Sequence, residues 1–372
     1  MRDSFFQPCT VANLQLPTRF VMSAMQDRRP EDLLPSTELA QHYADRIAGG
    51  IGLIVTQGTT MDHPTSVSPY ARLYPPAYDA WRRCAETVRE RGGQIAMQLW
   101  HESAMRPGGF SPSGLAFSGA TTGEALSTTQ IEELIEVYAA SAARAKALGF
   151  SGVELHGGHG YLLGLFASGT SNKRTDEWGG DTVEARMRFP LAVTRAVRKA
   201  VGPDFPILYR ISQPSPVTAP KIFRNPGELA TNAGALVAAG VDMLDVLAPR
   251  FWEPEFEGED LGLNAWLKRC TGAPVISGGS IGLSHDLMSV LTGGKAFSTA
   301  HEGFAELERR FDRGDFDLIA LGRPILVDPE FLVKIRAGRF DALKQTYEKD
   351  DISSEARTAR LAKARQAAPA SG

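Results

Sequence analysis

The segment from Ser127 to Tyr161 reads STTQIEELIEVYAASAARAKALGFSGVELHGGHGY and contains one unit of the predicted fold. Its first part predicts an amphipathic helix, because apolar side chains recur at helical spacing. These side chains are Ile131, Leu134, Ile135, Tyr138, Ala142, Ala145 and Leu148. Hydroxyl side chains at 127 to 129 can cap the helix start, and Gly149 can end it. A β-rich run over Gly152–Leu155 and a polar, glycine-rich segment follow, an order typical of parallel α/β folds.

Similar β-rich runs recur along the chain, each followed by a loop and a stretch with helical period. The eight runs are Arg19–Met22, Leu53–Thr56, Gln94–Leu99, Gly152–Leu155, Ile207–Ile211, Met243–Val246, Pro274–Ser277 and Leu318–Leu321. They predict an α/β fold of the (β/α)8 TIM barrel type, which needs about 250 of the residues. A doubly wound sheet is the alternative. It is disfavoured because Gly49-Gly50-Ile51-Gly52 precedes a strand, and no G-x-G-x-x-G turn opens a helix after the first run.

The residues beyond a minimal barrel fall in long segments rich in proline, glycine and aromatic residues. Three of them follow strand ends: His101–Ser127, Ser212–Pro226 and Leu247–Asn264. Because barrel enzymes build their active sites from loops at this end, we expect the functional site there. We divide the chain into a barrel, residues 1–351, and a C-terminal helical or disordered tail, residues 352–372, which is rich in alanine and basic residues.

The composition is that of a globular protein, with 43% hydrophobic residues, 22% charged residues and a formal net charge of −3. A negative net charge provides no positive electrostatic field that would attract nucleic acid. The apolar runs are too short to span a membrane, and the first residues do not resemble a secretory signal. Cys9, Cys84 and Cys270 lack zinc-site or disulfide spacing. We therefore expect a cytoplasmic protein with neither a nucleic-acid nor a membrane partner. A homo-oligomer is one option for its assembly.

Two segments near the end of the barrel predict a phosphate site. Ser277-Gly278-Gly279-Ser280 follows the seventh run, and Gly322-Arg323-Pro324 follows the eighth. Barrels often bind phosphate with these two loops, where glycines let backbone N–H groups approach an anion and a guanidinium can pair with it. An ordinary turn or a surface ion pair would explain either segment alone. Their joint placement favours the phosphate site.

The fourth run ends in His156-Gly157-Gly158-His159-Gly160-Tyr161, which brings two imidazoles and a phenol to one place. Three interpretations are open. A metal site would need further ligands, and among the other histidines only His63 and His101 follow strands. Histidines bonded only to the backbone are a second possibility. In the third, His156 and His159 donate hydrogen bonds to a substrate oxygen that becomes negative, and Tyr161 donates a proton.

Three more polar or aromatic side chains follow strands. Arg210 closes the fifth run and would direct a charge into the barrel, where it needs an anionic partner. Gln98 offers a donor and an acceptor for the edge of a heterocycle, although a polar side chain at a strand end is common. Trp100 is a candidate wall of a substrate pocket, and simple packing would also explain it.

These residues resemble the old yellow enzyme family of FMN-dependent ene-reductases, from Phe6 to about Ile335. The most specific stretch, His156 to Phe189, reads HGGHGYLLGLFASGTSNKRTDEWGGDTVEARMRF. It is close to the family's H-x-x-[HN]-G-Y-L, N-x-R-x-D-x-[YW]-G-G and R-x-R-F. Further matches are Val21–Met25, Tyr43–Gly52, Gln98–His101, Gly322–Pro324 and, for a bacterial branch, Arg250–Gly258.

The resemblance implies an FMN at the end of the barrel and NADH or NADPH as reductant. The phosphate would contact Gly278, Gly279, Gly322 and Arg323, and the ring would lie among Ala24, Met25, Gln26, Gly58, Gln98 and Arg210. His156 and His159 would bind a carbonyl or nitro oxygen, and Tyr161 would protonate the carbon α to that group. Arg210 would lie near the N1/C2 edge and stabilise the anionic reduced flavin. No metal is implied.

The chain departs from the family at Gln26, where members usually carry Thr or Cys near the flavin C4 oxygen. Asp27 and Arg28 follow in place of an aromatic residue. A glutamine can still donate a hydrogen bond, but it reaches further than Thr or Cys. This departure bears on redox potential, pocket volume and substrate range.

The predicted function is transfer of a hydride from NAD(P)H through flavin to the β carbon of an activated alkene, a small molecule with a carbonyl or nitro group. A non-catalytic flavin-binding protein is one alternative, and it would not need His156, His159 and Tyr161. A phosphate-binding barrel lyase or Schiff-base aldolase is the other. It would need a lysine at a strand end, and none of the eight runs is followed directly by one.

Overall fold

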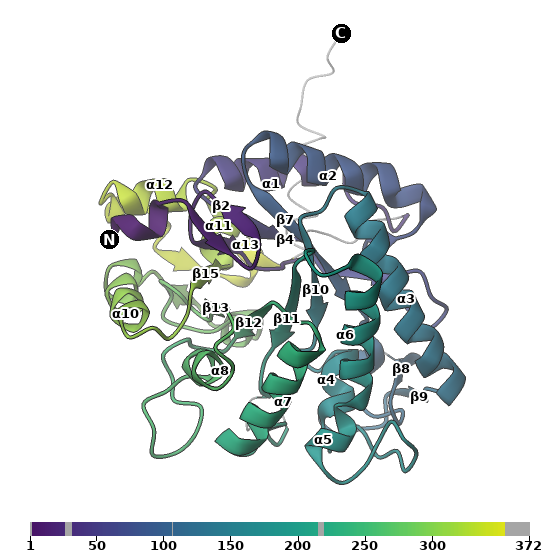
Figure 1. Ribbon diagram of the computed structural model, residues 1–372. Helices are drawn as coiled ribbons and strands as arrows, with labels where there is room; N and C mark the ends of the chain where they lie inside the picture. Colours follow the sequence, from purple (N-terminus) through teal and green to yellow (C-terminus); the bar gives the residue numbers. More distant parts are fainter. Residues whose placement is uncertain (1, 27–31, 106, 215–218, 354–372) are drawn as a thin grey trace.

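A computed structural model describes residues 2–26, 32–105, 107–214 and 219–353 and shows a closed barrel of parallel strands (Figure 1). The barrel strands are β3 (Phe20–Met22), β4 (Leu53–Val55), β7 (Gln94–Trp100), β10 (Gly152–His156), β11 (Ile207–Ile211), β12 (Met243–Leu247), β13 (Val275–Gly278) and β15 (Leu318–Leu321). They pair in this order, and β15 pairs with β3 to close the ring. Each of the eight predicted runs overlaps one strand. The barrel prediction is confirmed, and the doubly wound alternative is wrong.

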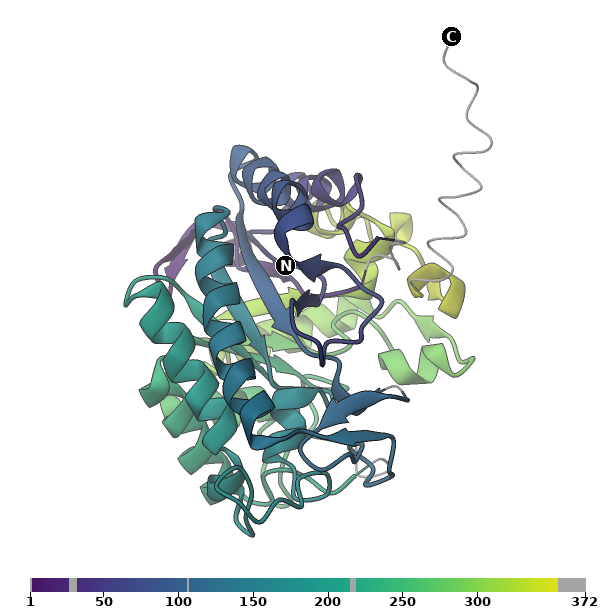
Figure 2. The ribbon, with the colours of Figure 1, turned by 90° about the vertical axis from the view of Figure 1, so that its right-hand side faces the viewer.

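Helices lie around the outside of the strands (Figures 1 and 2). Those of the first half are α1 (Leu39–Ala48), α2 (Tyr78–Glu90), α3 (Thr128–Ala147), α4 (Leu162–Ala167), α5 (Val183–Arg186) and α6 (Arg188–Val201). Those of the second half are α7 (Pro226–Ala239), α8 (Leu263–Thr271), α9 (Leu287–Leu291), α10 (Ala300–Asp312), α11 (Arg323–Val327), α12 (Phe331–Arg336) and α13 (Lys349–Ile352). The larger apolar core fills the space between strands and helices.

Helix α3 has the capping residues and the buried apolar face that its sequence predicts. The Ser127 hydroxyl accepts from the Gln130 N–H at 3.2 Å, and the Gln130 side chain accepts from the Ser127 N–H at 2.9 Å. This capping box satisfies two N–H groups at the helix start. Gly149 follows the helix with φ of 88°, a left-handed conformation that glycine adopts without strain. Six of the seven predicted apolar side chains are buried, and Ile135 is half-buried.

The barrel interior changes from apolar to charged along its axis. A second apolar cluster fills the end of the barrel where the strands begin, with strand residues such as Leu53, Leu208 and Ile276. The hairpin of β1 (Cys9–Val11) and β2 (Leu14–Leu16) contributes to this cluster and closes that end. Towards the carboxyl ends of the strands, the interior side chains are polar and charged. We call this end the mouth, because the predicted site residues lie there.

Several short elements outside the barrel were not predicted. They are β5 (Thr59–Met61), β6 (Arg72–Leu73), β8 (Gly109–Ser111), β9 (Gly123–Ala125), β14 (Ala296–Phe297) and β16 (Thr346–Tyr347). Strands β8 and β9 lie within the long segment that follows β7. The predicted tail lies almost wholly outside the described residues, so the division of the chain at residue 351 stays a prediction. None of the helices in the described ranges combines the length and apolar character that a membrane span requires.

Candidate active site at the barrel mouth

The turn after β10 requires its two glycines because the chain packs tightly there. A Cβ at Gly157 would lie 2.3 Å from Cε1 of Tyr209, and one at Gly158 would lie 2.7 Å from Oγ of Ser212. The Ser212 hydroxyl accepts from the His159 N–H at 2.8 Å. His159 itself has φ of 57°, which is uncommon for a residue with a side chain. This local geometry directs the turn back over the mouth.

The turn brings the predicted catalytic side chains together. The ring centroids of His156 and His159 are 5.4 Å apart, and those of His156 and Tyr161 are 4.7 Å apart. Trp100 contacts Tyr161 edge-on, with a centroid distance of 5.1 Å. Trp100 is itself buried, so its packing role is clear, and a role in a substrate pocket remains a proposal.

Both imidazoles are neutral near pH 7 in this environment. Burial, His159 and Arg210 hold the pKa of His156 well below its usual value. Desolvation by the surrounding protein atoms and the charge of Arg210 lower the pKa of His159 to about 4, although part of its surface is exposed to solvent. His156 Nδ1 accepts from the Gly158 N–H at 3.3 Å. The proton of neutral His156 is therefore on Nε2, which can act as a hydrogen-bond donor.

A layer of four polar side chains lies inside the barrel beside the histidines: Gln98, Glu154, Arg210 and Asp245. Strand register places Glu154 beside Gln98, and Arg210 between His156 and Asp245. Arg210 Nε donates to Asp245 Oδ2 at 2.8 Å, and its Nη2 donates to the same oxygen and to Ser23 Oγ. Burial lowers the pKa of Arg210, but Asp245 and Glu154 together raise it above its usual value. Asp245 is thus the anionic partner that the sequence argument required.

One N–H group of the Gln98 side chain forms a hydrogen bond within this layer. Its Nε2 donates to Glu154 Oε1 at 2.7 Å. The amide oxygen is therefore the acceptor that Gln98 retains for another group, together with its second N–H.

The two predicted phosphate segments meet at Ser280 and Arg323. Arg323 Nη2 donates to Ser280 Oγ at 3.2 Å, whereas its Nη1 is buried without a partner. Burial lowers the pKa of Arg323 to about 10, so the side chain stays charged near pH 7. Gly279 has φ of 137°, and a Cβ there would lie 2.4 Å from the Ala248 oxygen. A buried cation with an unpaired donor beside a glycine turn fits an anion.

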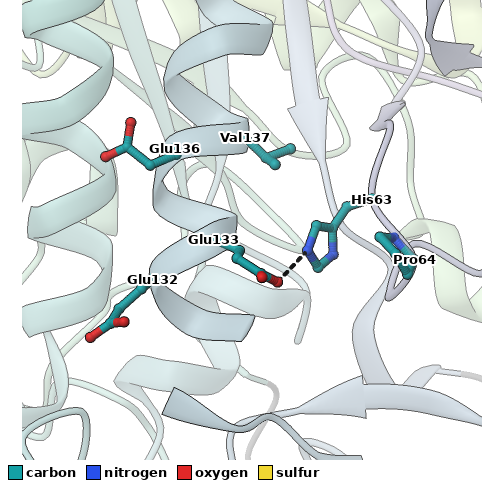
Figure 3. Close-up of a pocket in the computed structure, with 6 residues that line it drawn as sticks. All are labelled: His63, Pro64, Glu132, Glu133, Glu136 and Val137. Carbon is teal, nitrogen blue, oxygen red and sulfur yellow. Dashed lines mark hydrogen bonds and ion pairs between the residues drawn. The ribbon is translucent and has the colours of Figure 1, made fainter. Parts of the chain in front are cut away.

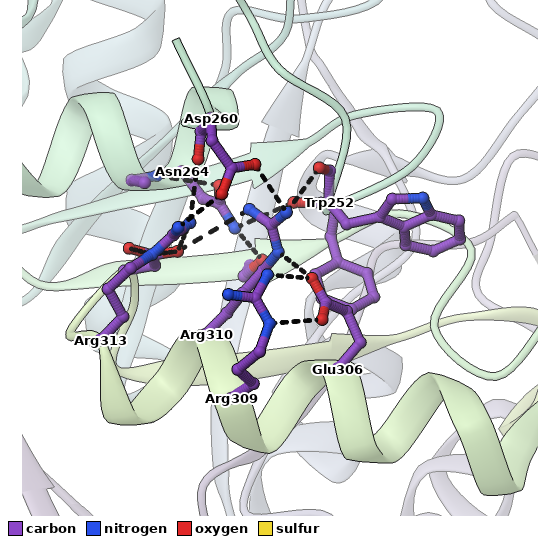
Figure 4. Close-up of polar contacts among 11 residues, drawn as sticks. Trp252, Asp260, Asn264, Glu306, Arg309, Arg310 and Arg313 are labelled. Carbon is purple, nitrogen blue, oxygen red and sulfur yellow. Dashed lines mark hydrogen bonds and ion pairs between the residues drawn. The ribbon is translucent and has the colours of Figure 1, made fainter.

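The loop after β12 is anchored beside this segment (Figure 4). Arg310 on α10 donates to the Trp252 oxygen at 2.7 Å, and Arg313 donates to Asp260 at 3.0 Å. Within the loop, the Phe251 N–H donates to the Gly279 oxygen at 3.2 Å. The two arginines therefore fix the loop that supports the phosphate segment.

Gln26 turns towards Gly58 and Trp100. Its Nε2 donates to the Gly58 oxygen at 3.4 Å, and its Oε1 is buried without a partner. A Cβ at Gly58 would lie 2.9 Å from the Trp100 ring, so this position has room only for glycine. Asp27 and Arg28 lie outside the described residues. Ala24 and Met25 follow β3; Met25 packs against the main apolar core, and Ala24 packs against the cluster inside the barrel.

The other strand-end histidines form a separate chain of hydrogen bonds. The Thr65 hydroxyl lies 2.9 Å from His101 Nε2 and 2.7 Å from His63 Nδ1. His63 Nε2 faces Glu133 of α3 at 3.4 Å, in a groove at the surface (Figure 3). In the described part of the chain, no group of three or more His, Cys, Asp or Glu side chains is arranged to hold a metal ion.

Sequence reasoning missed several polar side chains that complete the mouth: Ser23, Glu154, Ser212, Asp245 and Ser280. Two of them carried a readable signal. Glu154 and Asp245 are charged residues in the middle of apolar runs, VELH and MLDVL. A buried strand accepts such a residue only where a partner faces it. The three serines carried no comparable signal.

Comparison with known proteins identifies the family. The model of the NADH:flavin oxidoreductase / NADH oxidase family matches residues 4–281. The chain belongs to this family. Membership confirms the resemblance to old yellow enzymes and the assignment as an oxidoreductase. The expected FMN and nicotinamide are confirmed at the level of the family. The lyase or aldolase alternative is wrong.

Individual relatives agree with this assignment. An NADH oxidase of Thermoanaerobacter brockii is 32% identical over 92% of this chain and 52% of its own length. An NADPH dehydrogenase of Clostridium acetobutylicum is 30% identical over 88% of this chain and 93% of its own length. The structure of morphinone reductase in complex with tetrahydroNAD aligns with a TM-score of 0.74 and 26% identity, covering 92% and 93% of the two chains. The chain spans about half the length of some curated relatives that it matches.

Proposed function

We propose that this NADH:flavin oxidoreductase family member reduces activated alkenes, transferring a hydride from NADH or NADPH through FMN to the β carbon of an unsaturated carbonyl or nitro compound. The observation that carries the proposal is the cluster of His156, His159 and Tyr161. Two neutral imidazoles and a phenol at one mouth, beside the charged Arg210, suit a substrate oxygen that gains negative charge.

The described residues fit an FMN at the mouth. The unpaired Nη1 of Arg323 and the glycine turn at 278–279 suit its phosphate. The unpaired oxygen of Gln26 and the free acceptor of Gln98 are polar groups that suit the edge of a flavin ring. Gly58, Ala24, Met25 and Arg210 complete the proposed ring contacts, and Gly322 completes the phosphate contacts. All of these residues follow barrel strands or end them.

FMN, when bound, would supply hydride transfer in both half-reactions. The protein's part is to bind, orient and protonate the substrate. His156 donates through Nε2 and His159 through its ring N–H to the carbonyl or nitro oxygen, which favours negative charge there. Losing one such donor typically costs about 10²- to 10³-fold in rate. Tyr161 then gives its phenolic proton to the carbon next to that group. Trp100 would form one wall of the substrate pocket.

The proposal is tested on the cofactor first. The purified protein should release FMN on denaturation, and NADH or NADPH should bleach the flavin under anaerobic conditions. Arg323→Ala should bind FMN about ten- to a hundred-fold more weakly, since hydrogen bonds to charged groups contribute roughly 1.5–3 kcal/mol. Its affinity for riboflavin, which lacks the phosphate, should not change. Arg309→Ala on the exposed face of α10 is the matched control. Equal losses for FMN and riboflavin would contradict the phosphate assignment.

A further inference from the structure

The charged layer inside the barrel has an imbalance of formal charge. Glu154 and Asp245 are 0% and 1% exposed, and Arg210 is 1% exposed. Two ionised carboxylates against one guanidinium would leave a net negative charge in the barrel interior. Such a charge is costly to bury, and neighbouring carboxyl groups avoid ionising together.

The hydrogen bonds of the layer show which carboxyl oxygens could share a proton and so remove the surplus negative charge. Arg210 directs Nε and Nη2 to Asp245 Oδ2, and Gln98 donates to Glu154 Oε1. The remaining oxygens, Glu154 Oε2 and Asp245 Oδ1, are both buried without a donor. The two carboxyl groups meet at Arg210, whose Nε lies 2.8 Å from Asp245 Oδ2 and 3.4 Å from Glu154 Oε1. One proton between them would satisfy both oxygens and neutralise the surplus charge.

We propose that Glu154 and Asp245 share one proton at neutral pH, with Glu154 Oε2 donating to Asp245 Oδ1, so that the pair balances Arg210 with a single negative charge. Asp245 is the ionised member because it accepts two donors from Arg210. Burial raises the pKa of Glu154 well above its usual value; the charge of Arg210 lowers it, Asp245 raises it, and the hydrogen bond from Gln98 lowers it, with a raised pKa as the net result.

The shared proton makes Glu154 a positioning residue. It holds the Gln98 amide through Oε1 and Asp245 through Oε2, and Asp245 in turn holds Arg210. If Glu154 were ionised, the layer would carry a net negative charge and oppose the negative charge that Arg210 stabilises at the mouth. This consequence rests on the proposed function, whereas the shared proton itself does not.

Infrared spectroscopy of the protein as purified tests the proton directly. At pH 7 we expect a carbonyl stretching band of a buried protonated carboxyl group. Glu154→Gln should abolish it, because the amide replaces the acid and Asp245 is ionised. Asp245→Asn should also abolish it, because Glu154 alone beside Arg210 ionises. Glu255→Gln, which changes a carboxyl group of the loop after β12, should keep it. The proposal would be overturned if the parent protein showed no such band, or if either of these two variants, Glu154→Gln or Asp245→Asn, kept it.

The flavin midpoint potential gives the second readout. Each single variant keeps one negative charge against Arg210, so its potential should equal that of the parent. The double variant Glu154→Gln/Asp245→Asn leaves Arg210 unbalanced, and its potential should rise. If both carboxylates were ionised, each single variant would raise the potential and the two effects would add. Should the protein bind no flavin, the proposed function fails, while the infrared result still decides for or against the shared proton.

Discussion

Gly157 packs directly against the ring of Tyr209, so closely that an added Cβ would lie 2.3 Å from Tyr209 Cε1 and 2.4 Å from its hydroxyl oxygen. Tyr209 is buried in β11 and belongs to the main apolar core. The turn that carries the proposed catalytic residues therefore rests on the core of the barrel. Its first residue, His156, cannot move without disturbing the contact between β10 and β11.

Gly157→Ala should destabilise the protein, because the added methyl group would overlap the buried Tyr209 ring. Overpacking of this kind costs about 1–3 kcal/mol in the free energy of unfolding. Gly234→Ala is the control, since nothing lies within 4 Å of a Cβ there and alanine favours helix α7 by about 0.5–1 kcal/mol. Chemical denaturation checks both variants. Equal stability of Gly157→Ala and the parent would contradict the tight packing.

The histidine pair should bind an anionic phenol as neutral donors. Because the pKa of His159 is lowered to about 4 and that of His156 lies well below its usual range, neither ring titrates between pH 5.5 and 8. Affinity for a phenol that stays ionised over this range should therefore be constant. His156→Ala and His159→Ala should each weaken it about ten- to a hundred-fold, as expected for a hydrogen bond to a charged group. Binding that strengthens steeply as pH falls from 7 to 5.5 would show protonated imidazoles instead.

His101 should make the protein sensitive to acid. Burial and the nearby His63 lower its pKa to about 3, whereas an unfolded histidine has a pKa of about 6.5. Between these values the unfolded chain binds one more proton than the folded chain. The free energy of unfolding therefore falls with decreasing pH in this window, by up to about 1.4 kcal/mol per pH unit from His101.

His101→Asn can keep the acceptor for the Ser103 N–H but does not titrate, so its stability should fall less steeply between pH 6 and 4. Replacement of the exposed His285 by Gln controls for the loss of a histidine. Parallel stability curves for His101→Asn and the parent would show that His101 is charged in the folded protein.

Much of the fold could be predicted from the sequence because β-rich runs and helical periods are local signals. Ser127 at the start of α3 is a typical helix-capping residue and marks where the helix begins. All eight barrel strands appear in the sequence as apolar runs. The glycine-rich segments after β13 and β15 and the histidine turn could also be singled out, since glycines and ionisable residues at strand ends are unusual, and their roles stay predictions. The charged layer could be predicted only in part: Glu154 and Asp245 stand out as charged residues in apolar runs, but their arrangement around Arg210 depends on the register of three strands. The same holds for the contact of Gln26 with Gly58, which joins separate loops.

Tyr161→Phe separates protonation from hydride supply. It should slow oxidation of the reduced flavin by an enone about 10²- to 10⁴-fold, because the proton donor is lost. Reduction of the flavin by NADH or NADPH should change little, since no proton from Tyr161 is needed there. Stopped-flow measurement of the two half-reactions checks this. Equal slowing of both would indicate that Tyr161 acts through its packing against Trp100.

The central claim is tested most directly by anaerobic reoxidation of the reduced holoprotein with activated alkenes. The protein is reduced with one equivalent of NADH or NADPH and mixed with cyclic enones and nitroalkenes. The account predicts that the flavin is reoxidised and that one saturated product forms for each nicotinamide consumed. A flavin that stays reduced with every alkene, yet is reoxidised at once when oxygen is admitted, would contradict it.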